Sequence, residues 1–149
     1  MAAVRGVVTM NPPRLTPIRT DHAPQPAGHY AQGIRAGDML FISGQLPIAA
    51  DRSALPNLDF ETQAEQAIAN MLAVLDAAGG TPGDLARVTA YVVGVEHWPA
   101  FNGVYARLLG DARPARTVVP VPELHHGYLV EVDGIALLPQ SSESADGQS

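Results

Sequence analysis

The sequence contains no cysteine and no lysine among its 149 residues. The missing cysteine excludes a disulfide framework, a thiolate zinc site and a thiol nucleophile. The missing lysine excludes a Schiff base on a side-chain amine and a Walker-type phosphate loop, because both need that amine. Any chemistry must therefore use other polar groups.

Long apolar runs and basic stripes are also missing. No apolar run approaches 18 residues, so we expect no membrane span, and residues 1–10 make a poor secretion signal. Nine arginines stand against fifteen acidic residues, for a formal net charge of −6. An acidic domain with scattered arginines is a poor candidate for binding nucleic acid. We expect a cytoplasmic protein without membrane or nucleic-acid partners.

Length and composition indicate one globular domain. Hydrophobic residues make up 46% of the chain and charged residues 16%, which excludes a disordered chain and a coiled coil. Five prolines within residues 1–27 predict an extended N-terminal arm, and the polar residues 140–149 predict a disordered tail. The domain itself is expected over residues 28–139.

Hydrophobic periodicity predicts an α+β fold with the order strand, strand, helix, strand, helix, strand, strand. The expected ranges are strands over 29–36 and 39–43, a helix over 61–78, a strand over 88–95, a helix from Pro99 to Gly110, and strands over 116–121 and 128–138. Single helices between strands favour a mixed sheet with both helices on one face, a two-layer sandwich. The other face has no helix to cover it, which predicts burial against copies of the same chain.

Polar residues inside apolar strand patterns are the first candidates for a site. Arg116 interrupts an apolar strand, and its planar guanidinium suits a substrate carboxylate. A structural ion pair with Glu131 or Asp133 is the alternative. These two carboxyls alternate with valines, so they share one sheet face. Either could act as a general acid or base, or both could simply face solvent.

Two hydroxyl residues are weaker candidates on the same grounds. Such a tyrosine as Tyr30 is more often a packed aromatic with a satisfied hydroxyl, and Ser43 before Gly44 is more often an ordinary residue at a strand end. The five histidines show no spacing typical of a metal site, and adjacent His125 and His126 are expected to point apart. No Gly-x-Ser-x-Gly or Gly-x-Gly-x-x-Gly motif occurs. We therefore predict neither a metal nor an organic cofactor.

Taken together, these motifs resemble the Rid family of reactive-intermediate deaminases, the YjgF-type proteins, over about residues 22–139. The order and spacing of the fragments carry the resemblance, more than any one of them. They are Gly28-His-Tyr-Ala-Gln32, Phe41-Ile-Ser-Gly-Gln-Leu-Pro47, Gln66-Ala-Ile-Ala-Asn70, Leu75-Asp-Ala-Ala-Gly79, Val88-Thr-Ala-Tyr-Val92, Phe101-Asn102 with Tyr105, Pro114-Ala-Arg-Thr117 and Val130-Glu-Val-Asp-Gly-Ile-Ala136.

The resemblance implies a chorismate-mutase-like fold and a homotrimer with sites in the clefts between subunits. It also implies cofactor-free hydrolysis of reactive enamines or imines, such as 2-aminoacrylate, to 2-keto acids and ammonia. On this basis Arg116 would hold the substrate carboxylate and Glu131 would activate water. Tyr30 and Ser43 would line the pocket, and the backbone N–H of Gly44 would be a further carboxylate donor.

Two departures from the family pattern bear on the substrate. Val118 stands where the family often has a cysteine, so only its main chain could contact a carboxylate. His29 stands where a proline is usual and adds a titratable group beside the pocket. A trimer that binds small carboxylates without turnover is one alternative function. A pathway-specific family member with a larger substrate is another.

Overall fold

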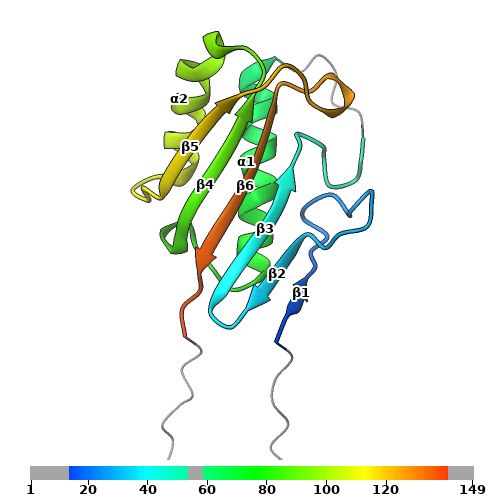
Figure 1. Cartoon of the computed structure of the whole chain (residues 1–149), viewed down its shortest axis with the longest axis vertical. Helices are drawn as coiled ribbons and strands as arrows, with labels where there is room; N and C mark the ends of the chain where they lie inside the picture. Colours follow the sequence, from blue (N-terminus) through cyan, green and yellow to red (C-terminus); the bar gives the residue numbers. More distant parts are fainter. Residues whose placement is uncertain (1–13, 54–58, 141–149) are drawn as a thin grey trace, which may run out of the picture.

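The structure of the protein is a computed structural model that describes residues 14–53 and 59–140. Within these ranges the chain forms six strands, two α-helices and three short 3-10 turns (Figure 1). The bounds are β1 (Thr16–Ile18), β2 (Gly33–Ala36), β3 (Met39–Gln45), α1 (Phe60–Ala77), β4 (Leu85–Val92), α2 (Trp98–Leu109), β5 (Ala115–Pro120) and β6 (Val130–Leu137), with the 3-10 turns at Pro82–Asp84, Val95–His97 and His125–Gly127.

Helix α1 lies where its hydrophobic period predicts it, displaced by one residue. The Asp59 carboxylate caps its first turn by accepting a 2.8 Å hydrogen bond from the backbone N–H of Thr62. The apolar positions at helical spacing, among them Ile68 and Met71, are fully buried. The helix ends before Gly79, whose φ of 85° belongs to the left-handed region that glycine enters freely.

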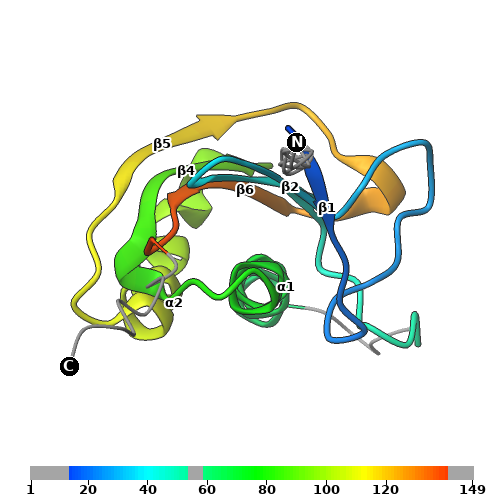
Figure 2. The ribbon, with the colours of Figure 1, turned by 90° about the horizontal axis from the view of Figure 1, so that it is seen from below.

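The six strands form one mixed sheet in the order β1-β2-β3-β6-β4-β5. β4 and β5 are parallel and are connected through α2, whereas all other neighbouring strands are antiparallel. Both helices pack on the same face of the sheet (Figure 2). This confirms the predicted α+β sandwich of one mixed sheet and one helical layer.

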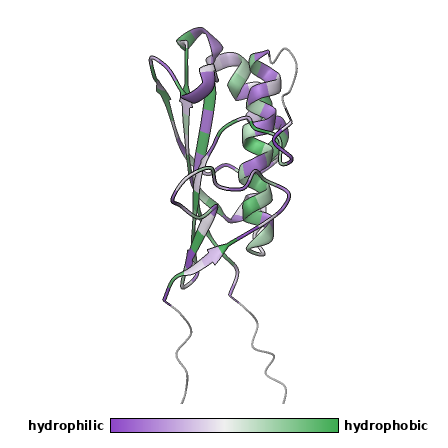
Figure 3. Cartoon of the chain, turned by 90° about the vertical axis from the view of Figure 1, so that its right-hand side faces the viewer, coloured by the Kyte–Doolittle hydropathy of each residue, from purple (hydrophilic) through white to green (hydrophobic). Residues whose placement is uncertain are grey.

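The hydrophobic core lies between the sheet and the helices (Figure 3). Leu40 and Val132 are fully buried on this inner face, as alternation along β3 and β6 requires. The opposite face is open, and Met39, Phe41 and Leu137 are exposed there by 42%, 42% and 60%. In the part of the chain that the structure describes, no helix is long and apolar enough to span a membrane.

Part of the predicted N-terminal arm belongs to the sheet, so the structure contains one strand more than predicted. β1 pairs with β2, and Ala23 is fully buried. The buried Gln32 side chain fixes this segment by accepting from the Thr20 backbone N–H at 2.8 Å and donating to the Thr20 and Pro24 carbonyls at 3.0 Å each. Residues 1–13 of the arm and 141–149 of the tail lie outside the described residues.

Two strands differ from their predicted bounds by three residues or more. The strand expected over 29–36 begins only at Gly33, and the strand expected over 88–95 is β4, Leu85–Val92. The apolar run continues beyond β4, but Gly94 has φ of 92° and turns the chain toward α2. At the other end, buried Leu85 pairs with Ala136, which extends β4 backwards.

Candidate active site

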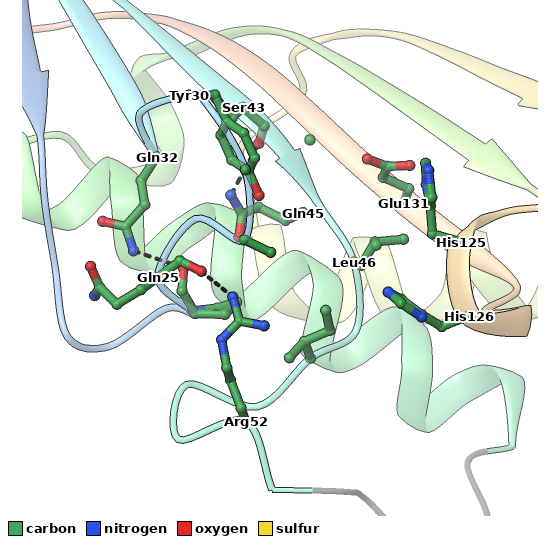
Figure 4. A pocket seen from close by; sticks show the side chains of 15 residues that line it. Gln25, Tyr30, Gln32, Ser43, Gln45, Leu46, Arg52, His125, His126 and Glu131 are labelled. Atoms are coloured by element: carbon green, nitrogen blue, oxygen red, sulfur yellow. Dashed lines mark hydrogen bonds between the residues drawn. The ribbon is translucent and has the colours of Figure 1, made fainter.

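A pocket of about 520 Å³ opens beside the carboxyl end of β3 (Figure 4). It lies between the segment before β2, the loop after β3, the 3-10 turn at His125–Gly127 and the start of β6. Its volume falls in the range of small-molecule sites. Four of the predicted site residues line it together: Tyr30, Ser43, Gly44 and Glu131.

Glu131 reaches the pocket because β3 bulges at this point. Ile42 pairs with Gly134 and Gln45 with Val132. The two residues between them on β3, Ser43 and Gly44, therefore lie opposite one residue of β6, Asp133, which defines a β-bulge. The Glu131 side chain lies against Gly44, where an added Cβ would collide with its Oε1 atom. Glycine at position 44 therefore leaves the space that the carboxyl occupies.

The environment of Glu131 favours its protonated form. Burial raises the pKa of this carboxyl above its ordinary value of 4.5, and the charge of Asp133 raises it further. His125 acts in the opposite direction and offsets part of the shift. A carboxyl whose protonated form is favoured in this way can accept a proton and return it during a reaction.

The two hydroxyl residues are placed differently in the pocket. The Ser43 hydroxyl donates a 2.6 Å hydrogen bond to the Ala31 carbonyl, so its proton is engaged and its oxygen is left to accept. The Tyr30 ring is 53% exposed and points its hydroxyl into the pocket (Figure 4). Tyr30 is therefore not the packed core aromatic that the sequence left open.

The three basic residues of the lining were not identified as site residues from the sequence: Arg52, His125 and His126. All three lie in irregular segments, where no periodicity signals which way a side chain points. His29 was predicted to add a titratable group beside the pocket. Its neighbours Gly28 and Tyr30 line the pocket, but the exposed His29 side chain is not part of the lining.

Arg116 and Val118 lie on a different surface of the same chain. Both are on β5, and β4 separates β5 from β6. Arg116 donates from Nη1 to the Asn102 side chain at 3.0 Å, and its guanidinium carbon lies 4.8 Å from the centre of the Tyr105 ring. Val118 packs against the core from the same face.

Arg116 and Glu131 project from opposite faces of the sheet. Arg116 pairs in register with buried Val88, which places its side chain on the helical face. Glu131 alternates with buried Val130 and therefore points to the open face. The ion pair of Arg116 with Glu131 or Asp133, left open by the sequence, is not formed, because Arg116 contacts Asn102 on α2 instead.

Asp133 shares the open face with Glu131 but is not part of the pocket lining. It accepts a 3.4 Å hydrogen bond from the Tyr91 hydroxyl, and burial raises its pKa. The same carboxylate raises the pKa of Tyr91 by its charge. Within residues 14–53 and 59–140, no group of three histidine, aspartate or glutamate side chains is arranged to hold a metal ion.

The similarity of this chain to known proteins extends over the whole domain. The family model described as endoribonuclease L-PSP matches residues 20–138. A RutC family protein of Pyrococcus horikoshii is 39% identical over 119 residues, which are 80% of this chain and 94% of that protein.

Two further matches carry chemical information in their names. A 2-iminobutanoate/2-iminopropanoate deaminase of Dermatophagoides farinae is 32% identical over 129 residues, covering 87% of this chain and 99% of that protein. The crystal structure of E. coli TdcF with bound serine superposes with a TM-score of 0.79 at 30% identity, covering 83% of this chain and 99% of TdcF.

Proposed function

The chain belongs to the Rid family, which includes the YjgF, RidA and RutC proteins, and we propose that it hydrolyses reactive imines and enamines to 2-keto acids and ammonia. The observation that supports this most directly is the Glu131 carboxyl, partly buried in a pocket with a raised pKa. The name of the Dermatophagoides farinae relative describes such a reaction for that protein.

In the proposed reaction Glu131 moves the protons. The water oxygen bonds to the carbon of the protonated imine, the C=N electron pair moves to nitrogen, and the Glu131 carboxylate takes one water proton. The acid then returns that proton to the nitrogen of the carbinolamine. As ammonia leaves, the remaining hydroxyl proton passes to Glu131 and the C=O bond forms. An imine carbon is already electrophilic, so the proposed steps need no metal or organic cofactor.

An enamine such as 2-aminoacrylate needs one earlier step. The protonated Glu131 carboxyl would donate its proton to the terminal methylene carbon, which converts the enamine into the protonated imine and leaves Glu131 as a carboxylate. Burial raises the pKa of this carboxyl, which favours the acid form that this step requires. The Ser43 oxygen and the Tyr30 hydroxyl border the same space and would orient the substrate or the water.

We propose that Arg116 of a second copy holds the substrate carboxylate. Within one chain Arg116 lies on the other face of the sheet from Glu131, yet its guanidinium is accessible beside Asn102. The exposed Met39, Phe41 and Leu137 give the open face an apolar area suited to contact with copies of the chain. A homotrimer, three times 15.7 kDa, would place sites between subunits, and light scattering measures that mass.

The proposed substrate is a small carboxylate rather than RNA, although the family model is described as an endoribonuclease. The chain has a net charge of −6 and no lysine. Arg52, which lines the candidate pocket, and Arg116, beside Asn102, lie on separate surfaces instead of forming a continuous basic groove.

The direct test is the decay of 2-iminopropanoate generated in situ from alanine by an amino-acid oxidase. The imine that remains is trapped with semicarbazide, with and without the protein. We expect catalytic amounts of protein to accelerate the loss of imine and the appearance of pyruvate. A protein that binds pyruvate but leaves the decay rate unchanged would be a carboxylate binder, and the proposed activity would be wrong.

A further inference from the structure

The candidate pocket contains a guanidinium that the proposed reaction does not use. Arg52 lies in the loop after β3, on one side of the pocket, and His125, His126 and Glu131 lie on the other side (Figure 4). This pocket therefore contains a permanent positive charge in addition to the one that Arg116 would bring. In a chain with net charge −6, that placement indicates an anionic ligand group.

The start of the Arg52 loop is anchored to helix α1. The Asn70 side chain, 1% exposed, donates hydrogen bonds to the Leu46 carbonyl at 3.0 Å and the Ile48 carbonyl at 2.8 Å. A buried amide that satisfies two loop carbonyls fixes where the loop leaves the sheet.

The end of the loop is a closed turn that presents Arg52. The Arg52 backbone N–H donates to the Ala49 carbonyl at 2.8 Å, and Arg52 itself has φ of 59°, an uncommon conformation for a residue with a side chain. The Asp51 carboxylate accepts from the backbone N–H of Ser53 at 2.9 Å and from its hydroxyl at 2.6 Å. The carboxylate of the neighbouring Asp51 is therefore already hydrogen-bonded to Ser53.

The Arg52 guanidinium retains unused donors. Its Nη2 atom donates to the Gln25 carbonyl, and this is a bond to backbone, not to a charge. Among residues 14–53 and 59–140, the single ion pair joins Arg107 to Glu65, so no described carboxylate neutralises Arg52. A guanidinium has five N–H donors in a planar fork, which matches a carboxylate in two-point contact.

We propose that Arg52 binds a second carboxylate, at the far end of the substrate side chain, and that the preferred substrates are imines of dicarboxylic amino acids. The inference rests on the proposed function, since imines of amino acids carry their anionic side-chain groups as carboxylates. His126 lies across the pocket as a further hydrogen-bonding group. The pocket of about 520 Å³ also exceeds the needs of a three-carbon imino acid.

The test compares two imines on the same variants. Imines of alanine and of glutamate are generated by amino-acid oxidases, and kcat/KM is measured for the wild type, Arg52→Gln, Arg52→Lys and a control. Arg35→Gln is the matched control, because Arg35 also donates to a backbone carbonyl, that of Gly37 at 2.9 Å, but lies outside the pocket.

We expect Arg52→Gln to lower kcat/KM for the glutamate imine by about tenfold to a hundredfold, the usual effect of removing a charge-assisted hydrogen bond. The alanine imine should change by less than about twofold, because its side chain does not reach Arg52. Arg52→Lys retains the positive charge without the planar fork, so its kcat/KM for the glutamate imine should lie between those of the wild type and Arg52→Gln. Arg35→Gln should leave both reactions unchanged.

Two results would overturn the assignment of Arg52. An equal loss for both imines would mean that Arg52 holds the carboxylate common to all substrates, and no loss for either would mean that it holds none. If the wild type hydrolyses neither imine, the proposed function is wrong, and calorimetry still tests Arg52. The wild type should then bind 2-oxoglutarate more tightly than pyruvate, and equal affinities, or a difference that persists in Arg52→Gln, would refute the inference.

Discussion

Replacement of Glu131 by glutamine removes the proposed proton carrier without changing the shape of the site. Glutamine has the same length and branching as glutamate, so the close approach to Gly44 is preserved. What is lost is the transfer of a proton to and from the reacting atoms, which contributes about 10²- to 10⁴-fold to a rate, or about 2.7–5.5 kcal/mol of barrier. We therefore expect kcat for 2-iminopropanoate to fall by about two to four orders of magnitude.

The thermal stability of Glu131→Gln at neutral pH should stay the same or rise, although its kcat falls. The fold raises the pKa of Glu131, so its stabilising contribution is present at acid pH and is lost as the pH rises through the folded pKa. At neutral pH the variant should thus melt at the same temperature as the wild type or higher, and at acid pH the advantage should vanish. Melting curves at several pH values measure this, with exposed Glu123→Gln as the control. A Glu131→Gln variant that turns over at a rate within about twofold of the wild type would refute the proton-transfer role.

Three further outcomes follow from the geometry. Gly44→Ala should fold but lose most imine turnover in the same assay, because the new methyl group would displace the Glu131 carboxyl from the pocket. Gln32→Leu should lower the free energy of unfolding by about 2–4 kcal/mol in urea titrations, because it removes the buried amide that accepts from the Thr20 backbone N–H and donates to the Thr20 and Pro24 carbonyls. The acid limb of kcat/KM against pH should lie above 4.5, the ordinary carboxyl pKa, and should be absent in Glu131→Gln.

The regular elements could be predicted because each has a local signal. The sequence of helix α1 combines an apolar period with a capping residue, Asp59, before it and a glycine, Gly79, after it, and the structure contains all three signals. Alternation along β6 correctly placed Glu131 and Asp133 on one face. Strand β1 has no such signal, since it is three residues long and contains Pro17, and the contacts that hold the segment after it come from Gln32, twelve residues beyond Thr20.

The candidate site could be predicted only in part, because some of its residues also lack a local signal in the sequence. Motif resemblance found Tyr30, Ser43, Gly44 and Glu131, and the structure brings these four together. Arg52 enters the pocket through a loop whose position depends on Asn70, a contact between residues more than twenty positions apart. Such long-range hydrogen bonds leave no periodicity in the sequence.

The placement of Arg116 gives the proposed site a requirement for two copies of the chain. In one chain the Arg116 guanidinium and the Glu131 carboxyl are on opposite faces of the sheet, so the site we propose would take Arg116 from one copy and Glu131 from another. Arg116→Ala and Glu131→Gln should each be inactive alone, yet their mixed assemblies should contain intact sites. Each subunit would then supply the group that the other lacks.

The most direct test of this account is therefore to unfold, mix in equal amounts and refold the Arg116→Ala and Glu131→Gln proteins, and to measure 2-iminopropanoate hydrolysis. Random assembly of sites between subunits restores about one quarter of them, so we predict about one quarter of wild-type activity from two inactive proteins. A mixture that forms assemblies of the wild-type mass but stays as inactive as its components would contradict a site shared between Arg116 and Glu131.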